Sequence, residues 1–121
     1  MANGKMLEMA KSLAISIVKI CKKIKEEKRE SVMTNQVLRS GTSIGANIHE
    51  SKYAQSPADF VSKMQIALKE CYETEYWIEI AQKAGLISED ISKNILHDCG
   101  SIRRMLISSI NTAKENRNGK Q

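Results

Sequence analysis

The chain has few of the residues that build sheets, and no segment that marks an exported or membrane protein. Aromatic residues make up 4% of its 121 residues, and there is one proline. With so little turn chemistry a many-stranded sheet is not expected, and the core must come from Leu, Ile, Val, Met and Ala, as in helical bundles. No apolar run approaches the roughly 20 residues that span a bilayer. The N-terminus lacks the charged-then-apolar layout of a signal peptide. We therefore expect a cytoplasmic protein that does not associate with membranes.

Cysteine is scarce and widely spaced. Cys21, Cys71 and Cys99 contain no CxxC pair, and their odd number argues against a disulfide framework. Each occupies an apolar position of a helical pattern, where a free thiol behaves as a small hydrophobe. The pattern predicts core thiols in a reducing compartment.

Motifs for enzyme chemistry are missing as well. A di-iron bundle needs Glu-x-x-His on two helices, but His49 and His97 follow Ala46 and Asn94 at that spacing. His97 and Cys99 lack two further metal ligands in a recognisable spacing. The run RSGTSIGAN lacks the Gly-Lys-Ser/Thr of a phosphate loop. We therefore expect a non-enzymatic protein with no catalytic, metal or cofactor site.

Hydrophobic periodicity predicts four amphipathic helices in a single domain of residues 1–121. Their expected ranges are about 5–29, 34–55, 57–84 and 89–116. Ser56 and Asp59 form a capping box at the start of the third helix, Gly85 ends it, and Ser88 caps the fourth. Side chains within residues 31–34 can cap the second helix. Short links between such helices predict an all-α, antiparallel up-down four-helix bundle.

The second predicted helix carries a seam of small residues. Gly41 and Gly45 lie four apart, and each costs about 1 kcal/mol relative to alanine inside a helix. Close approach of another backbone is the expected compensation. A polar stripe with Arg39, Asn47 and Glu50 runs beside this seam. We predict that these three side chains pair with one another or with a neighbouring helix, and a chemical role is the alternative.

Most of the aromatic content falls in one turn and a half of the third predicted helix. Tyr72 and Tyr76 are four apart and share a face largely off the core stripe, and Trp77 follows them. In a monomer such rings would be half exposed. Two interpretations stay open, namely an intersubunit contact and packing against the fourth helix.

Positive charge is concentrated towards the two ends of the sequence. The net charge is +5 for residues 1–39, −4 for 40–100 and +4 for 101–121. In an up-down bundle the basic segments lie at the poles, which is the electrostatic footprint of a nucleic-acid binder and also that of ordinary solvated helix ends. The candidate phosphate contacts are Lys22, Lys23, Lys25, Arg29, Arg103, Arg104, Lys114, Arg117 and Lys120.

Two long segments resemble a known family. LRSGTSIGANIHES at 38–51 and ADFVSKMQIALKECYETEYW at 58–77, followed by AGLIS at 84–88, resemble the four-helix-bundle 23S rRNA intervening-sequence proteins. The resemblance implies a homo-oligomeric ring, typically a pentamer. A related branch, the accessory proteins of diversity-generating retroelements, binds nucleic acid and a reverse transcriptase. This implies RNA or DNA, and a partner protein, as candidate partners. His49 stands where the family usually has a small residue, so no role is transferred to it.

Two functional hypotheses follow. The first is an oligomeric helical-bundle protein that associates with RNA through its basic surface. The alternative is a ring-forming protein–protein interaction scaffold that binds no nucleic acid. Salt-dependent RNA binding separates the two, because phosphate contacts weaken steeply as the salt concentration rises.

Overall fold

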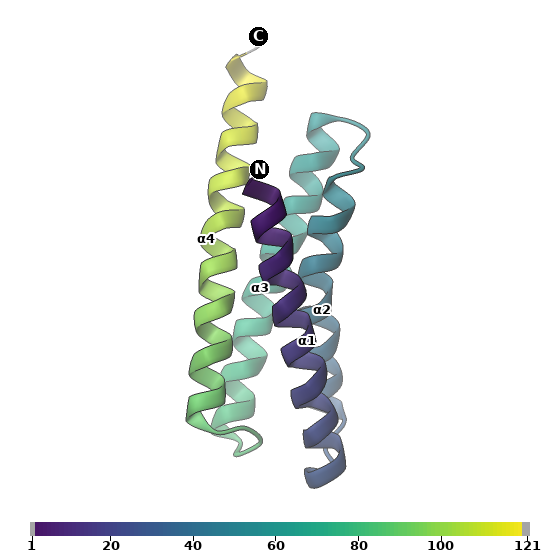
Figure 1. Cartoon of the computed structure of the whole chain (residues 1–121), viewed down its shortest axis with the longest axis vertical. Helices are drawn as coiled ribbons and strands as arrows, with labels where there is room; N and C mark the ends of the chain where they lie inside the picture. The colour runs from purple at the N-terminus through teal and green to yellow at the C-terminus, as the bar shows by residue number, and fades with distance from the viewer. Residues whose placement is uncertain (1, 120–121) are drawn as a thin grey trace.

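The computed structural model describes the backbone of residues 2–119 and the side-chain environments of residues 4–116. Within these limits the chain forms four α-helices and no strand. The helices are α1 (Ala2–Lys28), α2 (Val32–Ser51), α3 (Pro57–Lys83) and α4 (Glu89–Gly119). They run up and down in one domain, which confirms the predicted all-α bundle (Figure 1). Among residues 2–119, no helix combines the length and apolar character that a membrane crossing requires.

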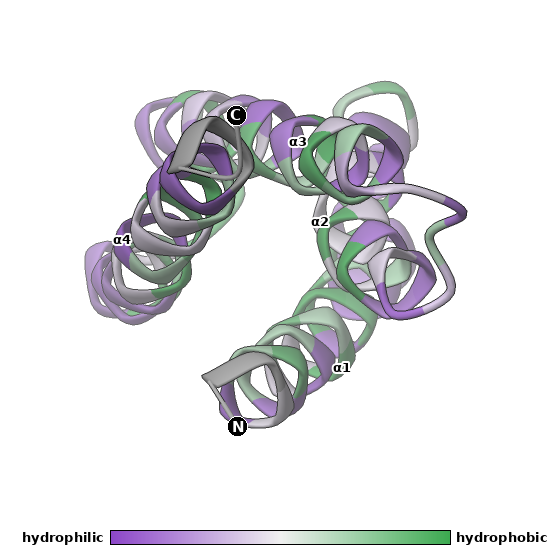
Figure 2. Ribbon diagram, turned by 90° about the horizontal axis from the view of Figure 1, so that it is seen from above, coloured by the Kyte–Doolittle hydropathy of each residue, from purple (hydrophilic) through white to green (hydrophobic). Residues whose placement is uncertain are grey.

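The helices follow one another around the bundle in chain order, with their hydrophobic sides turned inward (Figure 2). α2 packs against both α1 and α3, α3 also packs against α4, and the contact between α1 and α4 is the least extensive. Two connections meet at one end of the bundle. We call this end the basal pole and define it as residues 19–31 and 84–88.

The core is built from aliphatic side chains, methionine, alanine and cysteine, as the composition predicts. Its three thiols, Cys21, Cys71 and Cys99, are free and buried. The Cys71 thiol donates to the Cys99 carbonyl at 3.2 Å. The neighbouring Cys71 thiol, together with burial, raises the pKa of Cys99 above its usual value. The three buried cysteines therefore contribute to the packing of the core.

Three predicted helix ends are confirmed. The Ser56 hydroxyl accepts a hydrogen bond from the backbone N–H of Asp59 at 3.0 Å. Gly85 takes a φ of +80° just after α3, a conformation that glycine adopts without a steric penalty. The Ser88 hydroxyl accepts from the backbone N–H of Ile91 at 3.1 Å.

The predicted range of α2 is wrong at its C-terminal end. The helix stops at Ser51, so residues 52–55 belong to the connection to α3. The backbone N–H groups of residues 52–54 each donate to the carbonyl three positions earlier, which tightens the chain out of α-helical geometry. The buried Ser51 hydroxyl also donates to the Ile48 carbonyl at 2.6 Å.

The N-cap of α2 also differs from the prediction. Ser31 occupies the N-cap position but makes no side-chain capping bond. The Glu30 carboxylate instead accepts from the backbone N–H groups of Met33 at 2.8 Å and Thr34 at 2.9 Å. Burial acts to raise the pKa of Glu30, but these hydrogen bonds outweigh it and leave the pKa below its usual value.

Candidate nucleic-acid interface

The structure divides the predicted phosphate-binding cations into paired and unpaired side chains. Arg103 contacts the Glu75 carboxylate through Nε and Nη2, both at 3.3 Å, and its Cζ lies 5.7 Å from the centroid of the Tyr72 ring. The hydrogen bond and then the charge of Glu75 raise the pKa of Arg103. Arg104 is exposed, and its Nη2 donates to the Ser101 hydroxyl at 3.4 Å. Arg103 is therefore a link between α3 and α4, whereas Arg104 faces solvent.

Four predicted cations lie on the last turns of α1 and at its end. Lys22, Lys23 and Arg29 are exposed, and Lys25 is half-buried. Among the residues whose side chains are described, none of these four has a carboxylate oxygen within 4 Å. The basal pole thus presents positive charge that the protein itself does not neutralise by direct pairing.

Of the remaining candidates, Lys114 lies towards the other end of the bundle. Lys114 is exposed in the C-terminal part of α4. The side chain of Arg117 and the whole of Lys120 lie outside the described residues. The predicted cations therefore do not form one patch, and the basal pole holds the larger described group.

The outward face of α1 carries a second stripe that the sequence reading missed. Its members are Lys11, Ile15, Val18, Lys22 and Lys25, which we call the outer stripe of α1. Ile15 is 56% exposed and Val18 47% exposed. The sequence does contain a signal for this stripe, because its residues recur at steps of four and three, the same spacing that defines the buried stripe. The outer stripe spans roughly 21 Å of helix.

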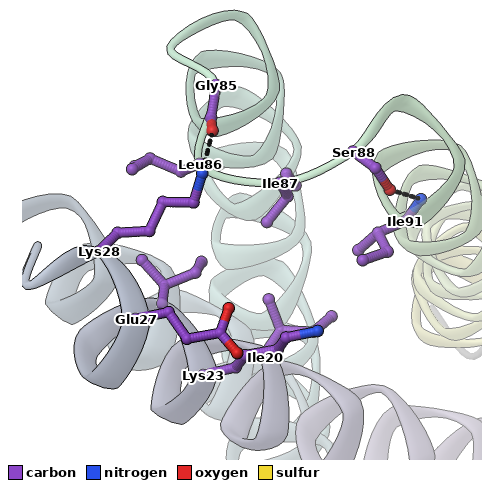
Figure 3. Close-up of a pocket in the computed structure, with 10 residues that line it drawn as sticks. Ile20, Lys23, Glu27, Lys28, Gly85, Leu86, Ile87, Ser88 and Ile91 are labelled. Atoms are coloured by element: carbon purple, nitrogen blue, oxygen red, sulfur yellow. Dashed lines mark hydrogen bonds between the residues drawn. The ribbon is translucent and has the colours of Figure 1, made fainter.

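A cleft of about 400 Å³ opens at the basal pole between α1 and the α3–α4 connection (Figure 3). Its aliphatic lining consists of Ile20, Ile24, Leu86, Ile87 and Ile91. Lys23, Glu27 and Lys28 add charged groups. The Lys28 ammonium donates to the Gly85 carbonyl at 3.0 Å and ties the end of α1 to the end of α3. The sequence showed Glu27 and Lys28 only as charges near the end of a helix and did not place them at a cleft, because 57 residues separate Lys28 from Gly85.

The glycine seam of α2 faces α1, a partner helix that the sequence did not identify when it predicted close approach of another backbone. A Cβ atom added to Gly45 would lie 3.5 Å from the Cβ of Ala10, in ordinary van der Waals contact. One added to Gly41 would overlap the Cδ1 of Ile17 and lie 3.1 Å from its Cγ2. The close approach of α1 and α2 therefore requires glycine at position 41, whereas position 45 has room for a Cβ atom.

Two members of the polar stripe of α2, Arg39 and Glu50, pair with a neighbouring helix as the first of the two interpretations predicted. Arg39 pairs with Glu70 at 3.2 Å and with Glu73, both on α3. Glu50 pairs with Lys63 of α3 at 3.2 Å.

The amide of Asn47 bonds within its own helix. Its Nδ2 donates to the Ser43 carbonyl at 2.9 Å. Arg39 and Glu50 thus join α2 to α3, and Asn47 bonds within α2. Contacts inside the protein therefore account for all three side chains without a chemical role.

The aromatic residues of α3 are half exposed, as predicted. Tyr72 and Tyr76 are 51% and 56% exposed. Tyr72 lies under Arg103, so packing against α4 holds for this ring. Trp77 lies with its centroid 5.1 Å from that of Tyr76 in an edge-to-face arrangement, and its Nε1 donates to Glu73 at 3.1 Å. An intersubunit contact through the outer faces of the two tyrosines stays a prediction.

A family model described as 23S rRNA-intervening sequence protein matches residues 3–108. The chain belongs to this family. It is also similar to a crystal structure of a protein with unknown function from the S23 ribosomal protein family of Bacteroides thetaiotaomicron. The two chains are 43% identical and superpose with a TM-score of 0.90, over 92% of this chain and 99% of the other. A comparison with curated proteins gives no match.

The segments that carry the resemblance to this family have distinct positions in the structure. Those at 38–51 and 58–77 lie on α2 and α3 and supply the ion pairs between these two helices. The first segment also contains the glycine seam that faces α1. The third segment, at 84–88, supplies most of the wall of the basal cleft contributed by the α3–α4 connection. The first two segments therefore specify the fold, and the third shapes a surface feature.

Proposed function

We propose that this protein is a non-enzymatic, oligomeric helical-bundle protein that binds RNA through the cations of its basal pole. The observation that carries the proposal is the contrast between two groups of basic side chains. Arg39 and Arg103 are held by carboxylates of α3. Lys22, Lys23 and Arg29 are exposed and have no carboxylate within 4 Å among the described side chains.

Such cations bind phosphate by charge, and they carry no base-edge geometry of their own. Their effect grows in an assembly, because each added chain brings like poles together and strengthens the local field. The field is screened beyond about 8 Å at physiological salt, so binding should be close-range and strongly salt-dependent.

The test is the slope of log affinity against log salt for a structured RNA. The variant Lys22→Glu/Lys23→Glu should reduce the magnitude of this slope by about 0.7–0.9 for each phosphate group that the variant can no longer bind. A matched control is Lys52→Glu/Lys69→Glu, which changes the net charge equally at two lysines outside the basal pole. Equal salt slopes for the wild type and the basal-pole variant would show that the basal pole does not bind RNA.

The alternative is a ring-forming scaffold, and a separate observation favours it. Apolar side chains are exposed on two different faces, Ile15 and Val18 on α1 and Ile66, Tyr72 and Tyr76 on α3. When one face of a chain contacts a different face of the next, the contact is heterologous and can close into a ring. Family membership is in keeping with a pentamer as the proposed state.

Light scattering tests the assembly independently of RNA. We expect the mass of a five-chain ring at micromolar concentration in moderate salt. Replacing Tyr72 and Tyr76 with serine should lower the mass if α3 forms the contact. A monomeric mass for the wild type would contradict self-assembly.

A further inference from the structure

The basal cleft combines three kinds of group, namely an aliphatic lining, a carboxylate and lysine ammonium groups, and the proposed RNA binding by charge uses only Lys23 among them. Its lining is largely aliphatic, and Lys23 and Glu27 add one charge of each sign. These two side chains are four residues apart on α1, yet they form no ion pair within 4 Å. Lys28 donates one of its three ammonium N–H groups to the Gly85 carbonyl, which leaves two for a ligand.

A ligand that matches all three features needs a flat apolar body, adjacent N–H donors for a carboxylate, and an anionic group for the lysines. Guanine presents N1–H and the 2-amino group side by side, and a carboxylate can accept from both with its two oxygens. Adenine, cytosine and uracil each place an acceptor at one of the corresponding positions. The faces of the base would pack between apolar side chains, as in sites that hold extruded bases.

We propose that the cleft binds one unpaired guanosine of an RNA, a proposal that rests on the proposed RNA binding. The base lies between the α1 and α3–α4 walls, its Watson–Crick edge on Glu27 and its phosphate at Lys23 and Lys28. The volume of about 400 Å³ lies within the range of about 300–1,000 Å³ of small-molecule pockets. The base is unpaired, because a paired guanine has its donor edge occupied by cytosine.

An RNA strand fits this position better than a free nucleotide does. Positive charge continues past the cleft to the other side of α1, at Lys22, Lys25 and Arg29. An α-helix with its side chains is only about 10–12 Å across, so a strand leaving the cleft can cross the end of α1 and reach these cations. A single nucleotide would not reach them.

The test compares three RNA hairpins of the same stem, one fully paired, one with a single bulged guanosine and one with a bulged inosine, which lacks the 2-amino group. Fluorescence anisotropy at fixed salt should give about tenfold tighter binding for the bulged guanosine than for the other two. Glu27→Gln should abolish this preference. Glu26→Gln, the same charge change at the adjacent exposed residue, should keep it.

A second variant addresses the cleft itself. Ile91→Trp fills the space between the two walls and should remove the preference for the bulged guanosine, while the fully paired hairpin keeps the wild-type affinity and salt slope. Helicity and melting temperature, measured for each variant, show that the fold is intact.

The outcomes separate this inference from the proposed function. Equal affinity for all three hairpins, with the wild-type salt slope, would overturn the guanosine site and leave charge-driven RNA binding in place. A guanosine preference that survives Glu27→Gln would also overturn it. If micromolar GMP displaces the hairpin, the cleft is a site for a free nucleotide and the proposal that its ligand is RNA is wrong. Loss of salt-dependent binding altogether would overturn both.

Discussion

The hydroxyl groups of Ser40 and Thr74 lie 3.0 Å apart at the centre of the α2–α3 interface, and both side chains are fully buried. Each hydroxyl also reaches a carbonyl of its own helix, Gln36 at 3.0 Å and Glu70 at 2.8 Å. A hydroxyl has one proton and two lone pairs, so one of the pair donates to the other and both are satisfied without water. This pair explains how two polar residues sit inside a largely apolar core.

Removing one hydroxyl of this pair should be measurably destabilising. Thr74→Val keeps the shape of the side chain, and we expect it to lower the free energy of unfolding by about 1 kcal/mol in urea titrations. In a Ser40→Ala background the same substitution should cost less, because the partner hydroxyl is already absent. An equal cost in both backgrounds would mean that the two hydroxyls do not interact.

The two glycines of the α1–α2 seam should respond differently to alanine. Gly45→Ala adds a methyl group at ordinary contact distance from Ala10, so the gain in helix propensity should raise the stability by up to about 1 kcal/mol. Gly41→Ala forces the buried Ile17 to move and should lower the stability by about 1 kcal/mol or more. Leucine at both positions should abolish the native fold or the assembly.

A rescue variant checks the cause at Gly41. Ile17→Val removes the Cδ1 atom that the new methyl group would overlap. Gly41→Ala should therefore cost less in the Ile17→Val background than in the wild type, as measured by thermal unfolding. If the cost is unchanged, Ile17 is not the obstacle.

Local signals in the sequence were enough to predict the fold and several helix ends. Ser56 and Gly85 act through backbone groups within a few residues of themselves, so their roles follow from residue type and spacing. The cap of α2 was assigned incorrectly, because Ser31 stands at the N-cap position but the longer Glu30 side chain reaches the free N–H groups.

The candidate site was predicted only in part, for a different reason. Residue types reveal the number of cations but not which of them meet a carboxylate from another helix. Arg103 and Lys22 have the same formal charge, yet only Arg103 has an acidic partner on α3. The basal cleft depends on α1 meeting the α3–α4 connection, a contact between residues 57 apart at Lys28 and Gly85. No pattern of neighbouring residues in the sequence predicts such a long-range contact.

The Glu30 cap should make stability depend on pH in the acid range. Its pKa is lower in the folded state than in the unfolded chain, so the capping contribution is present above the unfolded value, about 4.3, and is lost as the pH falls through the folded value. At pH 7, Glu30→Ala should cost about 1 kcal/mol, the usual range for a lost N-cap. The difference between wild type and variant in urea unfolding should shrink by pH 3. A difference that is constant from pH 7 to pH 3 would show that the ionised carboxylate is not what caps α2.

Arg29 combines a backbone cost with a proposed function, and two substitutions separate them. Its φ of 55° lies in the left-handed region, which costs a residue with a side chain about 1–2 kcal/mol relative to glycine, partly offset by the greater freedom of glycine in the unfolded chain. Arg29→Gly should therefore raise the free energy of unfolding by up to about 1 kcal/mol, whereas Arg29→Ala keeps the strained backbone and should leave it nearly unchanged. Both variants remove the same positive charge, so both should weaken RNA binding at the basal pole to the same extent and with the same change in salt slope. Equal stability of the two variants would contradict the backbone argument. Unchanged RNA affinity in both variants would show that Arg29 is not part of the proposed RNA interface.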